Sequence, residues 1–217
     1  GAAHRAHAST AGVPAIVAKR GGQCAAGLLM ERELKFLGDE LENPARPFVV
    51  ILGGAKVSDK IKVIDRLLEK ADTILIGGAM AYTFKLAHGE KVGKSLVEPD
   101  HKQTALDAEA KAKKLGVNFQ LPVDTVIATP VDTGKLNKKG KPVYDLTNVR
   151  TISGDIPDDA EGFSIGAETE KNYAAIIRSA KTILWNGPMG MFEDARFAAG
   201  TNAVAQAVVD ATQKNGA

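Results

Sequence analysis

The stretch FVVILGG, residues 48–54, is an unbroken apolar run that ends in two glycines. The stretch TILIGG, residues 73–78, has the same form. Short apolar runs bounded by glycine are typical of strands that are buried on both faces of a sheet. These two stretches therefore predict two strands of one buried sheet.

Apolar residues at helical spacing separate the predicted strands. Ile61, Ile64 and Leu68 mark one face of a helix between the two runs. The same reasoning predicts helices over 30–41, 79–87, 106–115, 173–177 and 203–211, and strands over 118–121, 125–128 and 182–185. This alternation indicates an α/β fold, with a doubly wound, mostly parallel Rossmann-like sheet and helices on both faces.

The segment 129–159 departs from this alternation. It has no helical stripe, and its lysines gather around Gly134 and Gly140. These lysines are Lys135, Lys138, Lys139 and Lys141. A basic patch for a phosphate is one interpretation, but such charge runs more often lie on a solvated surface. We therefore expect a surface excursion.

The composition is that of an ordinary globular protein. Hydrophobic residues make up 44% and charged residues 25% of the 217 residues, which argues against a disordered or fibrous chain. The net charge of +2 gives no general reason to bind nucleic acid or an anionic membrane. The lone Cys24 excludes an intramolecular disulfide and a cysteine-based metal site. We expect a monomeric protein that binds a small molecule, with no nucleic-acid or membrane partner. We also expect it to be cytoplasmic, since no signal peptide opens the chain.

Both ends of the chain suggest that further elements belong to this fold. Residues 1–14 have no preceding element to support them, and Asn215-Gly216 resembles a helix C-cap. In an alternating α/β chain a strand is expected after that helix. We therefore expect a piece of a larger protein.

Three glycine-rich loops are expected at the carboxyl ends of the strands, where α/β sheets bind ligands. In the first, 53–60, Lys56 and Lys60 are four residues apart, so we expect their ammonium groups to converge on the first turn of the next helix. Lysines are unfavourable at a helix N-terminus, and glycines let a ligand approach the backbone. We interpret the loop as a phosphate site rather than a plain turn with surface lysines. It matches neither the Walker nor the dinucleotide pattern.

The other two loops are less specific. The small residues of 77–81 admit a planar base against the backbone, or else allow a helix to pack closely on the sheet, and the residues alone favour neither. The loop 185–193 combines a Gly-Pro turn with Asn186 and with Glu193, whose carboxylate could accept hydrogen bonds from a ribose.

Four other residues call for an interpretation. Arg5 offers a bidentate fork to a phosphate or carboxylate, and His4 could donate to the same anion, although isolated surface basic residues are commoner. Trp185 and Phe192 are expected to be packing residues. No cluster of metal-ligating residues is found, so no metal site is predicted.

Several strings along the chain resemble phosphoglycerate kinases. The main ones are AHRAHAS (3–9), GGAKVSDKI (53–61), IGGAMAYTF (76–84) and WNGPMGMFE (185–193). Further support comes from SLVE (95–98), LPVD (121–124) and FAAGT (197–201). They occur in the order of the family and span nearly the whole chain.

The resemblance implies an activity and an architecture. Members of the family transfer a phosphoryl group between 1,3-bisphosphoglycerate and ADP, giving 3-phosphoglycerate and ATP, with Mg²⁺ bound to the nucleotide. They have two Rossmann-like lobes, one for phosphoglycerate and one for nucleotide, that close on each other. By this resemblance, residues 1–20 correspond to the end of the N-terminal lobe and the connection between lobes. Residues 21–217 correspond to the C-terminal nucleotide-binding lobe without its last elements.

The resemblance also implies roles for single residues. Arg5, with His4, would bind the phosphoglycerate, and Lys56 would steady the transferring phosphoryl group. The implied nucleotide-binding residues are Gly54, Ala55, Lys60, Gly77, Gly78, Gly166, Asn186, Pro188 and Glu193. Among these, Lys60 would contact phosphates, Gly77 and Gly78 the adenine, and Glu193 the ribose. Phosphoryl transfer needs positioning and charge neutralisation rather than a general base, which suits such a set.

The chain also departs from the family pattern. Ser164 and Ala167 stand where the family has Asp and Pro, and the family's Gly-Gly-Gly-Asp-Thr loop is absent. The chain by itself is therefore expected to be inactive. A nucleotide-binding module without catalysis is the alternative function. An oxidoreductase that binds a dinucleotide is poorly supported, because the pattern G-x-G-x-x-G is missing.

Overall fold

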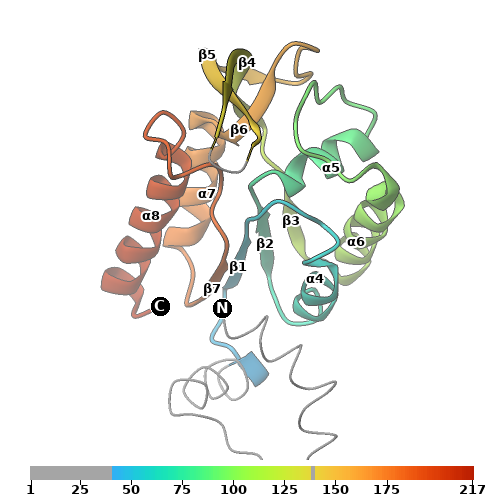
Figure 1. The fold of residues 1–217 in the computed structure, drawn as a ribbon. Coiled ribbons are helices and arrows are strands. Elements are labelled where there is room, and N and C mark those ends of the chain that lie inside the picture. Colours follow the sequence, from blue (N-terminus) through green and yellow to red (C-terminus); the bar gives the residue numbers. More distant parts are fainter. Residues whose placement is uncertain (1–40, 138–139) are drawn as a thin grey trace, which may run out of the picture. The chain divides into compact units, whose positions relative to one another are not determined.

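The computed structural model describes residues 41–137 and 140–217 (Figure 1). The chain divides into two units, residues 1–44 and 45–217, and the description below concerns the second unit. The helix predicted over 30–41 falls, except for Leu41, outside the described residues. The predicted domain boundary after residue 20 also lies outside them.

The centre of the second unit is a four-stranded parallel sheet of order β3-β2-β1-β7. Its strands are β1 (Phe48–Leu52), β2 (Thr73–Ile76), β3 (Asn118–Gln120) and β7 (Thr182–Asn186). Every residue of β1 and β2 is buried, as expected for apolar strands covered on both faces. The strands predicted over 48–52, 73–76, 118–121 and 182–185 are thereby confirmed.

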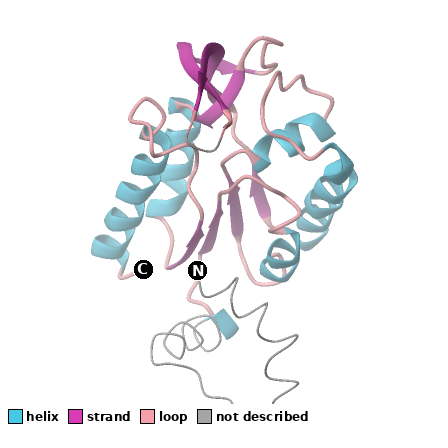
Figure 2. Cartoon of the chain, in the orientation of Figure 1, coloured by secondary structure: helices cyan, strands magenta, loops and turns pink. Residues whose placement is uncertain are grey.

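Helices cover both faces of this sheet, so the doubly wound α/β fold is confirmed (Figures 1 and 2). On one face lie α4 (Ile61–Leu67), α5 (Met80–Ala87) and α6 (Lys102–Leu115), with a short 3-10 helix (Pro99–His101) before α6. On the other face lie α7 (Ala167–Arg178) and α8 (Ala199–Asn215). The main core packs Val49 and Ile51 of β1 against Tyr173 and Ile177 of α7 and Ala207 of α8.

A second, antiparallel sheet of order β5-β4-β6 lies beside the carboxyl ends of the parallel strands (Figure 2). It consists of β4 (Asp124–Leu136), β5 (Pro142–Ser153) and β6 (Glu161–Ile165). The strand predicted over 125–128 is therefore confirmed as a strand, but it belongs to this antiparallel sheet. The hydrophobic run alone did not distinguish the two kinds of sheet.

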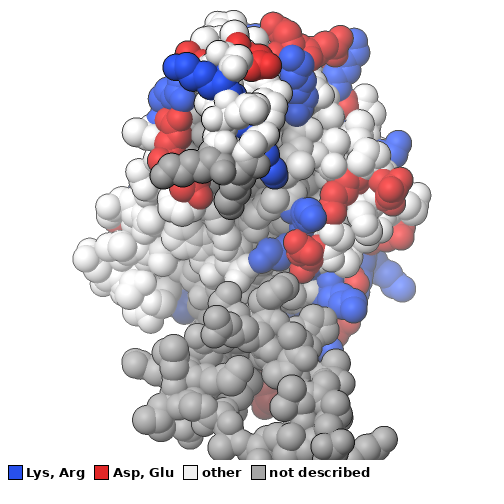
Figure 3. Space-filling view, in the orientation of Figure 1, with Lys and Arg blue, Asp and Glu red and all other residues white. Residues whose placement is uncertain are grey.

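The segment 129–159 is largely a hairpin of β4 and β5, and most of its described residues are exposed, as expected for a surface excursion. Figure 3 shows basic and acidic side chains interspersed over this part of the molecule. A surface patch that binds phosphate carries mainly positive charge, so this mixture favours the interpretation as a solvated surface.

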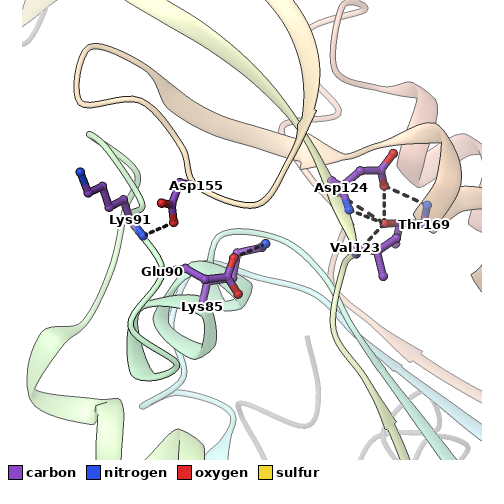
Figure 4. A network of polar contacts seen from close by, with 7 residues as sticks. All are labelled: Lys85, Glu90, Lys91, Val123, Asp124, Asp155 and Thr169. Carbon is purple, nitrogen blue, oxygen red and sulfur yellow. Dashed lines mark hydrogen bonds and ion pairs between the residues drawn. The ribbon is translucent and has the colours of Figure 1, made fainter.

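Polar contacts anchor the antiparallel sheet to the elements around it (Figure 4). Asp124, the first residue of β4, accepts hydrogen bonds from the backbone N–H groups of Glu168 (3.0 Å) and Thr169 (2.9 Å) in the first turn of α7. The Thr169 hydroxyl also donates to this carboxylate and accepts from Val123 N–H at 3.1 Å. Asp124 thus satisfies N–H groups that a helix start leaves unpaired, and it anchors the antiparallel sheet to α7.

A second set of contacts in Figure 4 anchors the loop after α5. Lys85 and Glu90 form an ion pair of 2.9 Å, and the backbone N–H of Lys91 donates to the Asp155 carboxylate at 2.8 Å. Asp155 lies between β5 and β6, so this bond holds the α5 loop to the antiparallel sheet. No helix of the described residues is long and apolar enough to cross a membrane.

Candidate nucleotide site

The three glycine-rich loops meet at one edge of the parallel sheet. Gly53 N–H donates to the Asn186 carbonyl (2.9 Å), and Gly78 N–H donates to the Met189 carbonyl (3.0 Å). Met80 N–H donates to the Gly54 carbonyl at 3.0 Å. Each loop is therefore bonded to another, as expected where the carboxyl ends of parallel strands lie side by side.

Glycine is required where these loops touch. A Cβ on Gly53 would overlap the Pro188 carbonyl, and a Cβ on Gly78 would lie 2.5 Å from the Gly54 carbonyl oxygen. Gly78 also has φ +69°, which L side chains rarely adopt. A Cβ on Gly77 would lie 2.5 Å from the Met189 sulfur. Close packing thus explains these glycines, but it is packing of loop on loop rather than of helix on sheet.

A cavity of about 270 Å³ lies between the loops and β6, and we call it the loop cavity. Its walls are mostly backbone and apolar side chains. Its lining residues are Gly54, Ala55, Gly78, Ala79, Leu96, Glu161, Gly162, Phe163, Pro188, Gly190 and Met191. Its volume is close to the lower end of the range for small-molecule sites, roughly 300 Å³.

Four residues proposed from the sequence line the loop cavity, namely Gly54, Ala55, Gly78 and Pro188. Leu96 was not predicted to bind the nucleotide, although the string SLVE contains it. The β6 wall was not predicted either, although Ser164 lies on that strand. Glu161 gave no sequence signal.

The structure does not bring Gly166 to the loop cavity. Gly166 is buried at the N-cap of α7, and a Cβ there would overlap the Asp124 carboxylate. Gly162, four residues earlier, lines the cavity with its backbone, and a Cβ there would overlap the ring of Tyr82. The two glycines of this stretch therefore have different surroundings, which spacing alone did not reveal.

Lys60 connects two of the loops. Its ammonium group donates to the side-chain oxygen of Asn186, the residue at the end of β7. The helix α4 begins only at Ile61, so Lys56 lies before the helix and is exposed. The expectation that both lysines share its first turn is therefore wrong.

The Lys56 loop is held in place from outside. Ser58 donates from its backbone N–H (3.0 Å) and from its hydroxyl (2.6 Å) to the two carboxylate oxygens of Glu98. Both groups of Ser58 are bonded to a single carboxylate, which defines the path of the chain between Lys56 and Lys60. Glu98 is far away in the sequence, so local spacing gave no sign of this anchor.

The loop after β7 carries Glu193, which is exposed as expected. Trp185 packs against the main core, but Phe192 is 49% exposed, so the expectation that Phe192 is a packing residue is wrong. Both residues line a second cavity of about 280 Å³, together with Gly187, Pro188 and Thr201.

Arg196 fixes the far side of the same loop. Its guanidinium donates to the Leu146 carbonyl (2.6 Å) and to the Asp194 carboxylate, with a closest distance of 2.6 Å. Hydrogen bonds from the Arg196 side chain and backbone lower the pKa of Asp194 to about 2. The next residue, Phe197, stacks on Phe163 with ring centroids 4.7 Å apart. The loop is thereby tied both to β5 and to a wall of the loop cavity.

Arg5 and His4 lie outside the described residues. Within 41–137 and 140–217, no three His, Cys, Asp or Glu residues gather closely enough to hold a metal ion. Mg²⁺ commonly keeps several waters and binds through substrate phosphates with few protein ligands. The described residues therefore do not form an all-protein metal cage.

Comparison with known proteins agrees with the resemblance. The family model described as phosphoglycerate kinase matches residues 1–217. The phosphoglycerate kinase of Clostridium novyi (strain NT) is 51% identical over 211 residues, which are 97% of this chain and 49% of that protein. That of Acidobacterium capsulatum is 51% identical over 210 residues, covering 97% of this chain and 48% of the relative.

A solved structure shows the same likeness in three dimensions. The phosphoglycerate kinase of Coxiella burnetii superposes with a TM-score of 0.74 at 37% identity, over 86% of this chain and 45% of that one. The chain spans about half the length of the relatives it matches. With a family match over its whole length, this chain belongs to the phosphoglycerate kinase family.

Proposed function

We propose that this chain provides the nucleotide-binding part of an enzyme that transfers a phosphoryl group between 1,3-bisphosphoglycerate and ADP, giving 3-phosphoglycerate and ATP. The observation that carries the proposal is the loop cavity, which three glycine loops build at the carboxyl edge of a parallel sheet. The family match supports the reaction. Because the chain spans about half of its relatives, the complete reaction goes beyond what the described residues carry out.

The cavity and its rim suggest how ADP binds. The base lies between the glycine backbone of 77–78 and the apolar wall formed by Leu96, Phe163 and Pro188. The phosphates lie toward Lys60, which is positioned by Asn186. Glu193 accepts hydrogen bonds from the ribose. In this arrangement the charged end of the nucleotide faces cations and backbone N–H groups.

Lys56 steadies the transferring phosphoryl group. The Lys56 side chain is exposed, so its ammonium group is accessible to a ligand. The hydrogen bonds between Ser58 and Glu98 hold the loop that carries Lys56. The attacking oxygen is already ionised, so these residues stabilise charge and need not remove a proton. His4 and Arg5 bind the phosphoglycerate, whose carboxyl group accepts the phosphoryl group.

A Mg²⁺ ion would be held mainly by the nucleotide phosphates and would supply neutralisation of their charge. Residues 1–20 form the end of the substrate lobe and the connection, and residues 21–217 form the nucleotide lobe. The enzyme is a cytoplasmic monomer, without nucleic-acid or membrane partners.

Calorimetry of the 217-residue chain with ADP tests the binding role. We expect binding that is weakened about tenfold or more by Lys60→Gln, because a charge-assisted contact of about 1.5 kcal/mol or more is lost. Lys62→Gln is the matched control, since Lys62 is exposed on α4 and outside the cavity lining. Absence of ADP binding, or equal effects of the two variants, contradicts the proposal.

The alternative function is a nucleotide-binding module without catalysis. The match to only half of each relative favours this alternative for the isolated chain. A coupled assay of turnover distinguishes the enzyme from the module. The module binds ADP but neither binds 3-phosphoglycerate nor turns over. In an active protein that contains this chain, Lys56→Ala should lower kcat by about a hundredfold or more while leaving the melting temperature nearly unchanged. Unchanged turnover would remove Lys56 from its assigned role.

A further inference from the structure

One charged side chain lines the loop cavity in the described part of the chain, and it belongs to Glu161. Glu161 and Phe163 flank Gly162 on β6, at the point where the pairing of β6 with β4 is irregular. Both line the cavity, and Gly162 between them packs its backbone against the Tyr82 ring. Glu161 is therefore part of the wall opposite the glycine loops.

The Glu161 carboxylate is half-buried at the cavity wall. Burial raises its pKa, and the charge of Lys94 opposes this rise. The carboxylate in turn adds to the effect of burial in raising the pKa of the Tyr82 phenol, so the two groups are close. A carboxylate in such a place costs free energy unless a donor reaches it. A ligand that brings an N–H group to this wall would therefore be stabilised there.

The position of Lys60 decides which part of a nucleotide supplies that group. Phosphates are attracted to the Lys60–Asn186 rim and repelled by a carboxylate, so the base is the part that faces Glu161. An ionised carboxylate only accepts hydrogen bonds. It therefore pairs with an amino group on the base and is repelled by a carbonyl oxygen at the same position.

We propose that Glu161 selects the base by accepting a hydrogen bond from its exocyclic amino group, so that the cavity prefers adenine to hypoxanthine. The two bases differ at C6, where adenine has an amino group and hypoxanthine has an oxygen, and at N1, which carries a hydrogen only in hypoxanthine. The inference rests on the proposed nucleotide-binding function and deepens it by naming the residue that reads the base. Sites built to bond an N–H donor reject analogues that lack it, by a large factor when buried. The partial exposure of Glu161 reduces this factor, and we expect about tenfold.

The test measures the dissociation constants of ADP and IDP by calorimetry for the wild-type chain, Glu161→Gln and Glu168→Gln. The wild type should bind ADP about tenfold more tightly than IDP. In Glu161→Gln the preference should fall to about threefold or less, because the amide can also donate to the oxygen of hypoxanthine. Glu168→Gln makes the same chemical change on the exposed face of α7 and should keep the wild-type ratio.

The outcomes separate the two proposals. If ADP binds and Lys60→Gln weakens it, but the ADP/IDP ratio is near one or is unchanged in Glu161→Gln, the role of Glu161 is wrong and the nucleotide site stands. If ADP does not bind, both proposals fail. The ratio of the ADP and IDP dissociation constants of the wild type tests the proposal by itself, so the test holds even if Glu161→Gln folds poorly.

Discussion

The parallel and the antiparallel sheet are held together in different ways. All five residues of β1 are buried in the parallel sheet, whereas nearly all residues of β5 are exposed or partly exposed. Burial of β1 removes apolar surface from water on both faces, and β5 depends mainly on pairing with β4. Stability therefore resides mainly in the parallel sheet, and a few specific anchors hold the hairpin.

The largest expected effect distinguishes the interiors of the two sheets. Ile51→Ala removes a side chain that is fully buried in the main core and should lower the free energy of unfolding by about 2–5 kcal/mol. Val131→Ala in β4, where Val131 is 47% exposed, should change it by about 0.5 kcal/mol or less. Urea unfolding followed by circular dichroism measures both. Equal losses would mean that the hairpin carries as much stability as the core.

A second comparison concerns glycines. Gly53→Ala places a Cβ onto the Pro188 carbonyl, so one loop must move, at a cost of about 1–3 kcal/mol. A Cβ on Gly134, in the hairpin, would have no atom within 4 Å. Gly134→Ala should therefore lower the free energy of unfolding by only about 1 kcal/mol, the cost of the positive φ. Thermal unfolding checks this, at about 2–4 °C per kcal/mol for a chain of this size. A Gly53 variant as stable as the Gly134 variant would refute the close loop packing.

The Asp124 anchor between β4 and α7 is a third target. Asp124→Ala removes the acceptor for two N–H groups of α7 and should cost about 1–2 kcal/mol. Asp124→Asn keeps one acceptor oxygen and should cost less. Hydrogen exchange should show faster exchange of the Glu168 and Thr169 amides in the Ala variant. Unaltered exchange there would mean that the first turn of α7 does not depend on Asp124.

The smallest expected effect concerns the exposed ion pair between Asp194 and Arg196. The pKa of Asp194 is lowered from 3.8 to about 2 in the folded state, so its contribution is present above about pH 4 and is lost as the pH falls through about 2. The melting temperature of the wild type should therefore exceed that of Asp194→Asn at pH 6, and the difference should shrink toward pH 2. A difference that is independent of pH would mean that the ion pair is not its cause.

The two sheets also differ in what the sequence could predict. Apolar runs and helical spacing were sufficient for β1, β2, β7 and the helices of the described part, because burial on both faces leaves a continuous apolar pattern. The pairing of β4 with β5 and β6 was missed, since exposed antiparallel strands carry no such run. In the site, the family resemblance pointed to Gly54, Ala55, Gly78 and Pro188, which line the cavity. The β6 wall and the Glu98 anchor come from residues distant in sequence, which local patterns cannot bring together.

The contacts among the glycine loops have a consequence for the evolution of this protein. A Cβ at Gly53, Gly78 or Gly187 would meet the backbone of a neighbouring loop, so a larger residue in one loop is tolerated only after another loop has shifted. Substitutions at these positions should therefore be strongly epistatic rather than additive. The three loops are constrained to change as a set. The side chains of β6 face the same cavity but do not belong to the three loops. Single substitutions on β6 are therefore the main way in which the base preference can change.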